Sequence, residues 1–78
     1  ASADLNIRKV VEMALLTSAS AVILAHNHPS GVALPSQADV QATVQVRDAL
    51  KRLDIRLIDH IIVADGDYVS MASSGLLR

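Results

Sequence analysis

The sequence predicts an α/β fold, a sheet layered with helices, and three features lead to that class. A short apolar run early in the chain is typical of a buried strand. Apolar residues at helical spacing lie on both sides of that run, which indicates a helix before it and a helix after it. Two further apolar segments are joined by an Asp-Gly pair, a β-hairpin signal. The expected order is therefore helix, strand, helix, strand, strand.

The first helix is predicted over residues 4–18, where apolar residues recur at helical spacing and Asp4 can cap the start. The run SAVILA, residues 20–25, follows as a strand of the kind that is covered on both faces. A strand inside a sheet needs a neighbour on each edge. We therefore expect this chain to be a piece of a larger domain whose first strands precede it.

The segment HPSGVALP contains both prolines and a glycine, so it is predicted to be a loop. A second helix should begin at Ser36 and run to about Leu53, with a rough apolar stripe along one side. The segment IRLIDHIIVADGDYVSM then reads as two strands that turn at Asp65 and Gly66. Gly66 supplies the positive φ that a tight hairpin requires. The closing segment ASSGLLR predicts at most a short turn.

Composition limits the chain to one small domain. Its 78 residues are 51% hydrophobic with a single aromatic residue, Tyr68, which predicts an aliphatic core. A chain of this size buries only about 60% of the surface that its unfolded form exposes. So much apolar surface in so few residues suggests that some of it meets another segment or subunit, and pairing into a homodimer is one arrangement that provides this.

The net charge of −1 argues against direct nucleic-acid binding, which needs clustered lysine and arginine. The basic segment RDALKRLDIR is interleaved with Asp48 and Asp54, as on a solvated helix face. The chain has no cysteine, which excludes disulfides and thiolate metal sites and fits a reducing compartment. No apolar run approaches the roughly 20 residues of a membrane span, and nothing resembles a signal peptide. We expect a cytoplasmic protein with no membrane partner.

His26 and His28 stand at the end of the first predicted strand. Residues i and i+2 of a strand point to the same face, so both imidazoles can approach one point. The following loop is long enough for the second helix to bring Asp39, in its first turn, back over the strand end. Zinc binds histidine nitrogen and aspartate oxygen readily, and two histidines with one carboxylate leave a fourth position for water, as in catalytic zinc sites.

A second interpretation needs no metal. A His-x-His pair is a weak signal by itself, because histidines often lie at strand ends for packing or hydrogen bonding. Ser36 and Asp39 also match a capping pattern, and the helix dipole favours an acidic residue in the first turn. The spacing leaves both interpretations open. They are compatible, since Asp39 can stabilise the helix start and still bind a metal.

The pattern H-x-H-x(7)-S-x(2)-D, which begins at His26 and ends at Asp39, resembles the JAMM motif of JAB/MPN metalloprotease-like domains. The flanking segments look like the RadC branch, bacterial proteins long labelled DNA repair proteins. The resemblance runs from about residue 8 to the C-terminus. It implies a JAB/MPN (cytidine-deaminase-like) layered sheet with flanking helices, of which residues 1–78 would be a partial RadC-like domain without its N-terminal strands.

The resemblance also implies roles for individual residues. His26, His28 and Asp39 would hold Zn2+. Ser36 would donate a hydrogen bond to the oxyanion that forms on the attacked carbonyl. The implied reaction is hydrolysis of a peptide or isopeptide bond in a substrate that the sequence does not identify. The general base of the family is a glutamate on a strand before the first helix. Glu12, the one glutamate here, does not match that position, so we expect it to be a solvated helix residue.

Two alternatives to a zinc hydrolase follow. The chain could be a non-catalytic interaction or scaffold module of the same fold, since JAB/MPN relatives include scaffolding members and fold alone does not decide function. DNA binding is suggested only by the family label, and the charge balance argues against it. For His60, we favour a structural role at the sheet over a role beside the metal, and Asp59 is a weak candidate for orienting a neighbouring imidazole.

Overall fold

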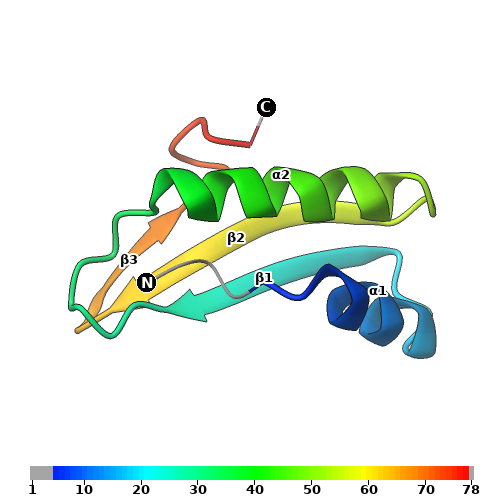
Figure 1. Cartoon of the computed structure of the whole chain (residues 1–78), viewed down its shortest axis with the longest axis horizontal. Helices are drawn as coiled ribbons and strands as arrows, with labels where there is room; N and C mark the ends of the chain where they lie inside the picture. The colour runs from blue at the N-terminus through cyan, green and yellow to red at the C-terminus, as the bar shows by residue number, and fades with distance from the viewer. Residues whose placement is uncertain (1–4, 78) are drawn as a thin grey trace.

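The structure is a computed structural model that describes residues 5–77 (Figure 1). Its elements follow the predicted order, and they are α1 (Ile7–Leu16), β1 (Ala21–Asn27), α2 (Gln37–Lys51), β2 (Arg56–Ala64) and β3 (Asp67–Ser70). The prediction of an α/β fold with flanking helices is confirmed.

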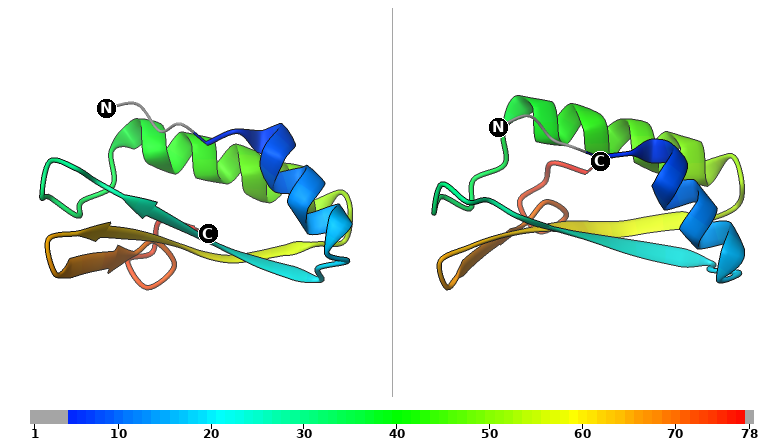
Figure 2. Two further views of the ribbon diagram at one scale, coloured as in Figure 1. Left: turned by 90° about the horizontal axis from the view of Figure 1, so that it is seen from below. Right: turned by 60° about the horizontal axis from the view of Figure 1, so that its bottom comes forward.

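The sheet is mixed, with the strand order β1-β2-β3. β1 runs parallel to β2, and β2 runs antiparallel to β3. The parallel pair requires a crossover connection, and α2 provides it along one face of the sheet (Figure 2). α1 lies on the same side of the sheet, at the end where β1 begins and α2 finishes (Figures 1 and 2). At the other end of the sheet, away from α1, the C-terminal end of β1 therefore lies close to the start of α2.

The core lies between α2 and the sheet. Val46 and Leu50 of α2 are fully buried, and they pack with Ala14, Ile55 and Leu57 in one aliphatic cluster. This arrangement confirms the expected aliphatic core. Burial of these side chains against the parallel strand pair holds α2 in place and so fixes the position of its first turn.

β1 does not have the cover that its sequence predicts. Within residues 5–77 it pairs with β2 alone, and every second residue from Ala21 to Asn27 is exposed, including Ile23 at 60%. The described residues therefore cover one face of β1 and leave its other face and one edge open.

The start of α1 differs from the prediction. Asn6 is the N-cap, and its side-chain oxygen accepts a hydrogen bond from the backbone N–H of Lys9 at 3.1 Å. Asp4, the predicted cap, lies outside the described residues. α1 begins later than predicted because Asn6 accepts from a free backbone N–H of its first turn, and it ends at Leu16 with Thr17 as the C-cap. Neither described helix has the length and apolar character that a bilayer crossing requires.

The hairpin between β2 and β3 is as predicted. Asp65 and Gly66 both have positive φ, at 41° and 78°, the combination that a two-residue turn of this hand needs. Asp65 also contacts the loop that follows β1. The φ of Gly31 in that loop is 84°, and a Cβ at this position would lie 2.7 Å from Oδ2 of Asp65. A side chain at position 31 would therefore have to push the exposed Asp65 carboxylate aside.

Candidate metal centre

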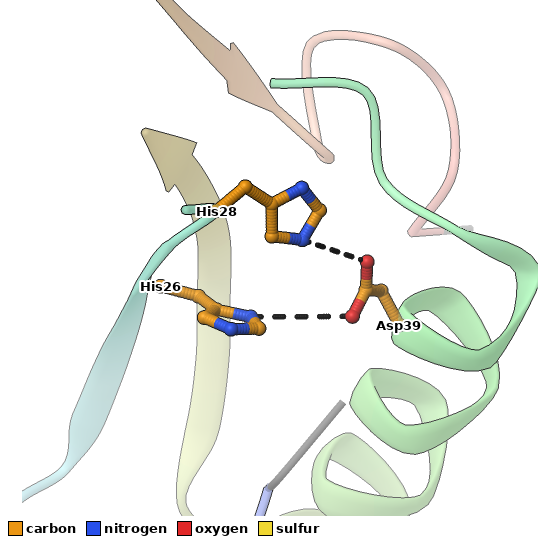
Figure 3. Close-up of side chains that lie close together, drawn as sticks. All are labelled: His26, His28 and Asp39. Atoms are coloured by element: carbon orange, nitrogen blue, oxygen red, sulfur yellow. Dashed lines mark ion pairs between the residues drawn. The ribbon is translucent and has the colours of Figure 1, made fainter. Parts of the chain in front are cut away.

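Three side chains converge where β1 ends and α2 begins (Figure 3). His26 is on β1, His28 follows directly after it, and Asp39 is in the first turn of α2. One ligand atom from each residue can be chosen so that all lie within 4.8 Å of one another. The two histidines reach the same side because they are two residues apart in extended chain. The structure thus brings together the three residues that the sequence predicts as ligands.

Hydrogen bonding fixes the tautomer of His28. Its Nδ1 lies 3.0 Å from the carbonyl oxygen of Val32. A carbonyl can only accept, so Nδ1 carries the hydrogen and a neutral ring has its lone pair on Nε2. That Nε2 lies 3.1 Å from Oδ2 of Asp39. Histidine ligands of metals are commonly oriented in this way, with the second ring nitrogen donating to a carbonyl.

Asp39 is held by the capping arrangement. Its Oδ2 accepts from the backbone N–H of Ser36 at 2.8 Å, and its own N–H donates to Oγ of Ser36 at 3.0 Å. This reciprocal pair is a capping box, so the predicted cap is confirmed. Ser36 is exposed, and its hydroxyl lies beside the site as the N-cap. The oxyanion role of Ser36 stays a prediction.

The charge state of Asp39 follows from these contacts. The side chain is only 1% exposed, and burial alone raises its pKa. Hydrogen bonds from Ser36, followed by the positive charge that His28 and His26 carry when protonated, outweigh that effect and hold the pKa below its ordinary value. Asp39 is therefore a buried carboxylate anion at neutral pH.

The acceptor atoms of the site that lack a hydrogen-bond partner are placed where they could bind a cation. Oδ1 of Asp39 is buried without a hydrogen-bond partner and lies 3.9 Å from Nδ1 of His26. The Nε2 lone pair of neutral His28 faces a carboxylate oxygen, an arrangement that is repulsive unless a proton or a cation lies between them. A buried acceptor without a partner costs about 1 to 3 kcal/mol. Two imidazoles and a carboxylate are also a donor set that zinc accepts.

His60 is closer to this centre than the sequence suggests. It is fully buried on β2, with its ring stacked near that of His26 at 6.1 Å between centroids and 20° between planes. Its Nδ1 lies 2.7 Å from Oγ1 of Thr43, a buried residue of α2. Burial, followed by the neighbouring His26, lowers the pKa of His60, so the ring is neutral. The sequence analysis does not single out Thr43 as a residue near the site. The signal that could have indicated it is its position one helical turn after Asp39, on the same side of α2.

The suggestion that Asp59 orients an imidazole is wrong. Its carboxylate accepts hydrogen bonds from Oγ of Ser70 at 2.5 Å and from the backbone N–H groups of Ala72 and His60 at 2.9 and 2.7 Å. Neighbouring residues of a strand point to opposite faces, so Asp59 turns away from the ring of His60. Its role is to fasten the turn after β3 to β2.

Glu12 lies in α1, at the end of the sheet opposite the candidate centre (Figure 1). Its side chain is exposed, as the sequence predicts for a solvated helix residue. Among the described residues, the metal-ligating group contains no carboxylate other than Asp39. The described part of the chain therefore offers no glutamate to act as a base at this centre.

The family model and the related sequences that match this chain point to the same protein family. A family model described as the RadC-like JAB domain matches residues 1–76. The chain is 59% identical over 68 residues to a UPF0758 protein of Stutzerimonas stutzeri, which covers 87% of this chain and 30% of the relative. It is 54% identical over 70 residues to a UPF0758 protein of Cellvibrio japonicus, covering 90% of this chain and 31% of that relative. The chain thus spans about 30% of the length of these curated relatives.

Proposed function

The chain belongs to the family of RadC-like JAB domains, and we propose that it carries the Zn2+ site of a hydrolase that cleaves peptide or isopeptide bonds. The observation that carries the proposal is the convergence of His26, His28 and Asp39, whose ligand atoms lie within 4.8 Å of one another. The free lone pair of His28 and the unpartnered oxygen of Asp39 support a cation at that point.

The residues divide the work of such a reaction. His26, His28 and Asp39 would hold the zinc, which supplies Lewis acidity for a carbonyl and for water when it is bound. The capping box holds the Asp39 side chain, and the carbonyl of Val32 selects the tautomer of the neutral His28 ring in which Nε2 has the lone pair. Oγ of Ser36 accepts from the N–H of Asp39, so its own hydrogen is available to donate to a substrate oxygen.

The general base would come from outside residues 5–77. Glu12 lies at the far end of the sheet, and the relatives are about three times as long as the aligned segment. We propose that a glutamate on another segment of the whole protein completes the site. The present chain would then bind zinc without turning over substrate, and only a protein with that segment would hydrolyse it.

A scaffold role is the second candidate. It is favoured because residues 5–77 place no carboxylate other than Asp39 in the candidate metal-ligating group. The two roles differ in a hydrolysis assay with peptide and lysine-linked isopeptide substrates, run on the whole protein with zinc. Hydrolysis that is lost in His26→Ala supports the hydrolase.

Zinc content, measured by elemental analysis of the purified chain, tests the site itself. We expect about one zinc per chain, lost in His26→Ala and retained when a surface residue such as Glu12 is changed to glutamine. Zinc uptake without hydrolysis by the whole protein would support the scaffold, and no zinc uptake would contradict the proposed site.

A further inference from the structure

Two buried polar side chains behind the candidate centre have no part in the proposed reaction. Thr43 lies on α2, one turn after Asp39, and His60 lies on β2. Both are completely buried. Polar groups in such positions are expected to be fully hydrogen-bonded, so their partners can be assigned one by one.

The hydroxyl of Thr43 determines the tautomer of His60. Oγ1 of Thr43 lies 2.7 Å from the main-chain oxygen of Asp39 and 2.7 Å from Nδ1 of His60. The main-chain oxygen can only accept, so the Thr43 hydrogen goes to it. Nδ1 of His60 must then carry a hydrogen and donate it to Oγ1. The second ring nitrogen, Nε2, is left with its lone pair, buried and without a partner.

Thr43 and His60 contact two of the candidate metal ligands, and these two ligands lie on different elements. Thr43 binds the backbone of Asp39 on α2, and the ring of His60 stacks near that of His26 on β1. Oδ1 of Asp39, the oxygen outside the capping box, is buried and has no hydrogen-bond partner.

We propose that Thr43 and His60 are a positioning pair for the candidate metal centre. The Thr43 hydroxyl bonds the backbone of Asp39 and fixes one tautomer of His60, and so holds both the Asp39 turn and the ring that stacks with His26. The inference rests on the proposed function in one respect, because it concerns affinity for the metal that His26, His28 and Asp39 would bind. It predicts that a hydroxyl with no contact to metal or substrate controls zinc affinity.

The test uses variants of nearly equal size. Thr43→Val keeps the shape and removes the hydroxyl, whereas Thr43→Ser keeps the hydroxyl. Thr17→Val is a matched control. Oγ1 of Thr17 donates to the backbone oxygen of Met13, four residues earlier, at 2.8 Å, as Oγ1 of Thr43 donates to that of Asp39, but Thr17 lies away from the candidate metal centre. Zn2+ affinity is measured by competition with a chromophoric chelator, and circular dichroism checks that each variant is folded.

We expect Thr43→Val to bind Zn2+ about 10- to 100-fold more weakly, the usual loss when a partner of a metal ligand is removed. Thr43→Ser and Thr17→Val should bind as the unchanged chain does. Equal affinity in Thr43→Val and the unchanged chain would overturn the inference. So would an equal loss in the Val and Ser variants, since packing and not the hydroxyl would then be responsible.

A second measurement needs neither metal nor mutation. Long-range 1H–15N NMR correlation spectra of the metal-free chain report which nitrogen of His60 carries the hydrogen. The Nδ1–H tautomer is expected, and the Nε2–H tautomer would overturn the pair even if Thr43→Val failed to fold. A chain that shows the Nδ1–H tautomer but takes up no zinc would contradict the proposed function and the affinity role, while leaving the hydrogen-bonded pair itself supported.

Discussion

Nε2 of His28 lies 3.1 Å from Oδ2 of Asp39, although the hydrogen of the neutral imidazole is on the opposite nitrogen, where it binds the carbonyl of Val32. When the ring is neutral, two acceptors therefore face each other beside the buried carboxylate of Asp39. The same carboxylate is held by the capping box of α2, and its other oxygen has no hydrogen-bond partner. These contacts prepare a cation site from a strand end and a helix start.

Zinc should stabilise the folded chain through this site. A ligand that binds only the folded state at 100 times its Kd adds about 2.7 kcal/mol to the free energy of unfolding. For a domain of this size, that raises Tm by about 10 to 20 °C. Thermal unfolding followed by circular dichroism, with zinc and with chelator, measures the difference. His28→Ala should unfold at the same temperature in both conditions, and a rise equal to that of the unchanged chain would exclude His28 as a ligand.

Ser36→Ala should lower the free energy of unfolding by about 1 kcal/mol, because it removes the acceptor for the N–H of Asp39 at the start of α2. Ser36→Gly should lower it by only a few tenths of a kcal/mol, since glycine is tolerated at this position. Urea unfolding of the metal-free chain measures both. An unchanged free energy of unfolding in Ser36→Ala would mean that the hydroxyl does not cap the helix.

Gly31→Ala should destabilise the chain more than Gly66→Ala. Both residues have positive φ, which costs a residue with a side chain about 1 to 2 kcal/mol. A Cβ at Gly31 would also press on Oδ2 of Asp65, whereas a Cβ at Gly66 meets no atom within 4 Å. Urea unfolding compares the two variants.

The Asp65→Ser background separates the two costs at Gly31. Shortening the side chain removes the contact with the new Cβ, so Gly31→Ala should cost less there, while the backbone strain remains. An unchanged cost in that background would show that the contact with Asp65 contributes nothing.

Stability should fall in acid partly through Asp59. Burial alone raises the pKa of Asp59, but hydrogen bonds from Ser70 and from the backbone N–H groups of Ala72 and His60 outweigh it and bring the pKa below its ordinary value. A lowered folded-state pKa gives stability that is fully present above the unfolded value of about 3.9 and is lost as pH falls through the folded value.

Asp59→Asn removes that contribution. The variant should be less stable than the unchanged chain by about 1 kcal/mol at pH 6, a value that allows for partial exposure of the carboxylate. The difference should shrink as the pH falls below about 3.9. Urea unfolding in chelator at several pH values measures it, and a difference that stays constant with pH would contradict the assignment.

The sequence predicts the local features of this fold well because they depend on neighbouring residues. The start of α2 follows from Ser36 and Asp39, which cap each other, and the hairpin follows from the positive φ of Gly66. The convergence of His26 and His28 follows from the two-residue period of a strand. These are short-range relationships that spacing alone expresses.

What the sequence does not predict depends on register and on competition between nearby residues. Thr43 and His60 meet only because α2 packs on β2 in one particular register, which no spacing reveals. Asp59 binds the turn after β3, because its side chain leaves β2 on the face opposite His60. The cap of α1 at Asn6 depends on which polar residue lies nearest the first free backbone donors.

Crystals of the chain grown with zinc, with diffraction recorded on both sides of the zinc absorption edge, test the central claim most directly. We predict one anomalous peak at the end of β1, bonded to a ring nitrogen of His26, Nε2 of His28 and a carboxylate oxygen of Asp39. The absence of a peak there, or a peak bound by other residues while these three side chains keep their metal-free contacts, would contradict it.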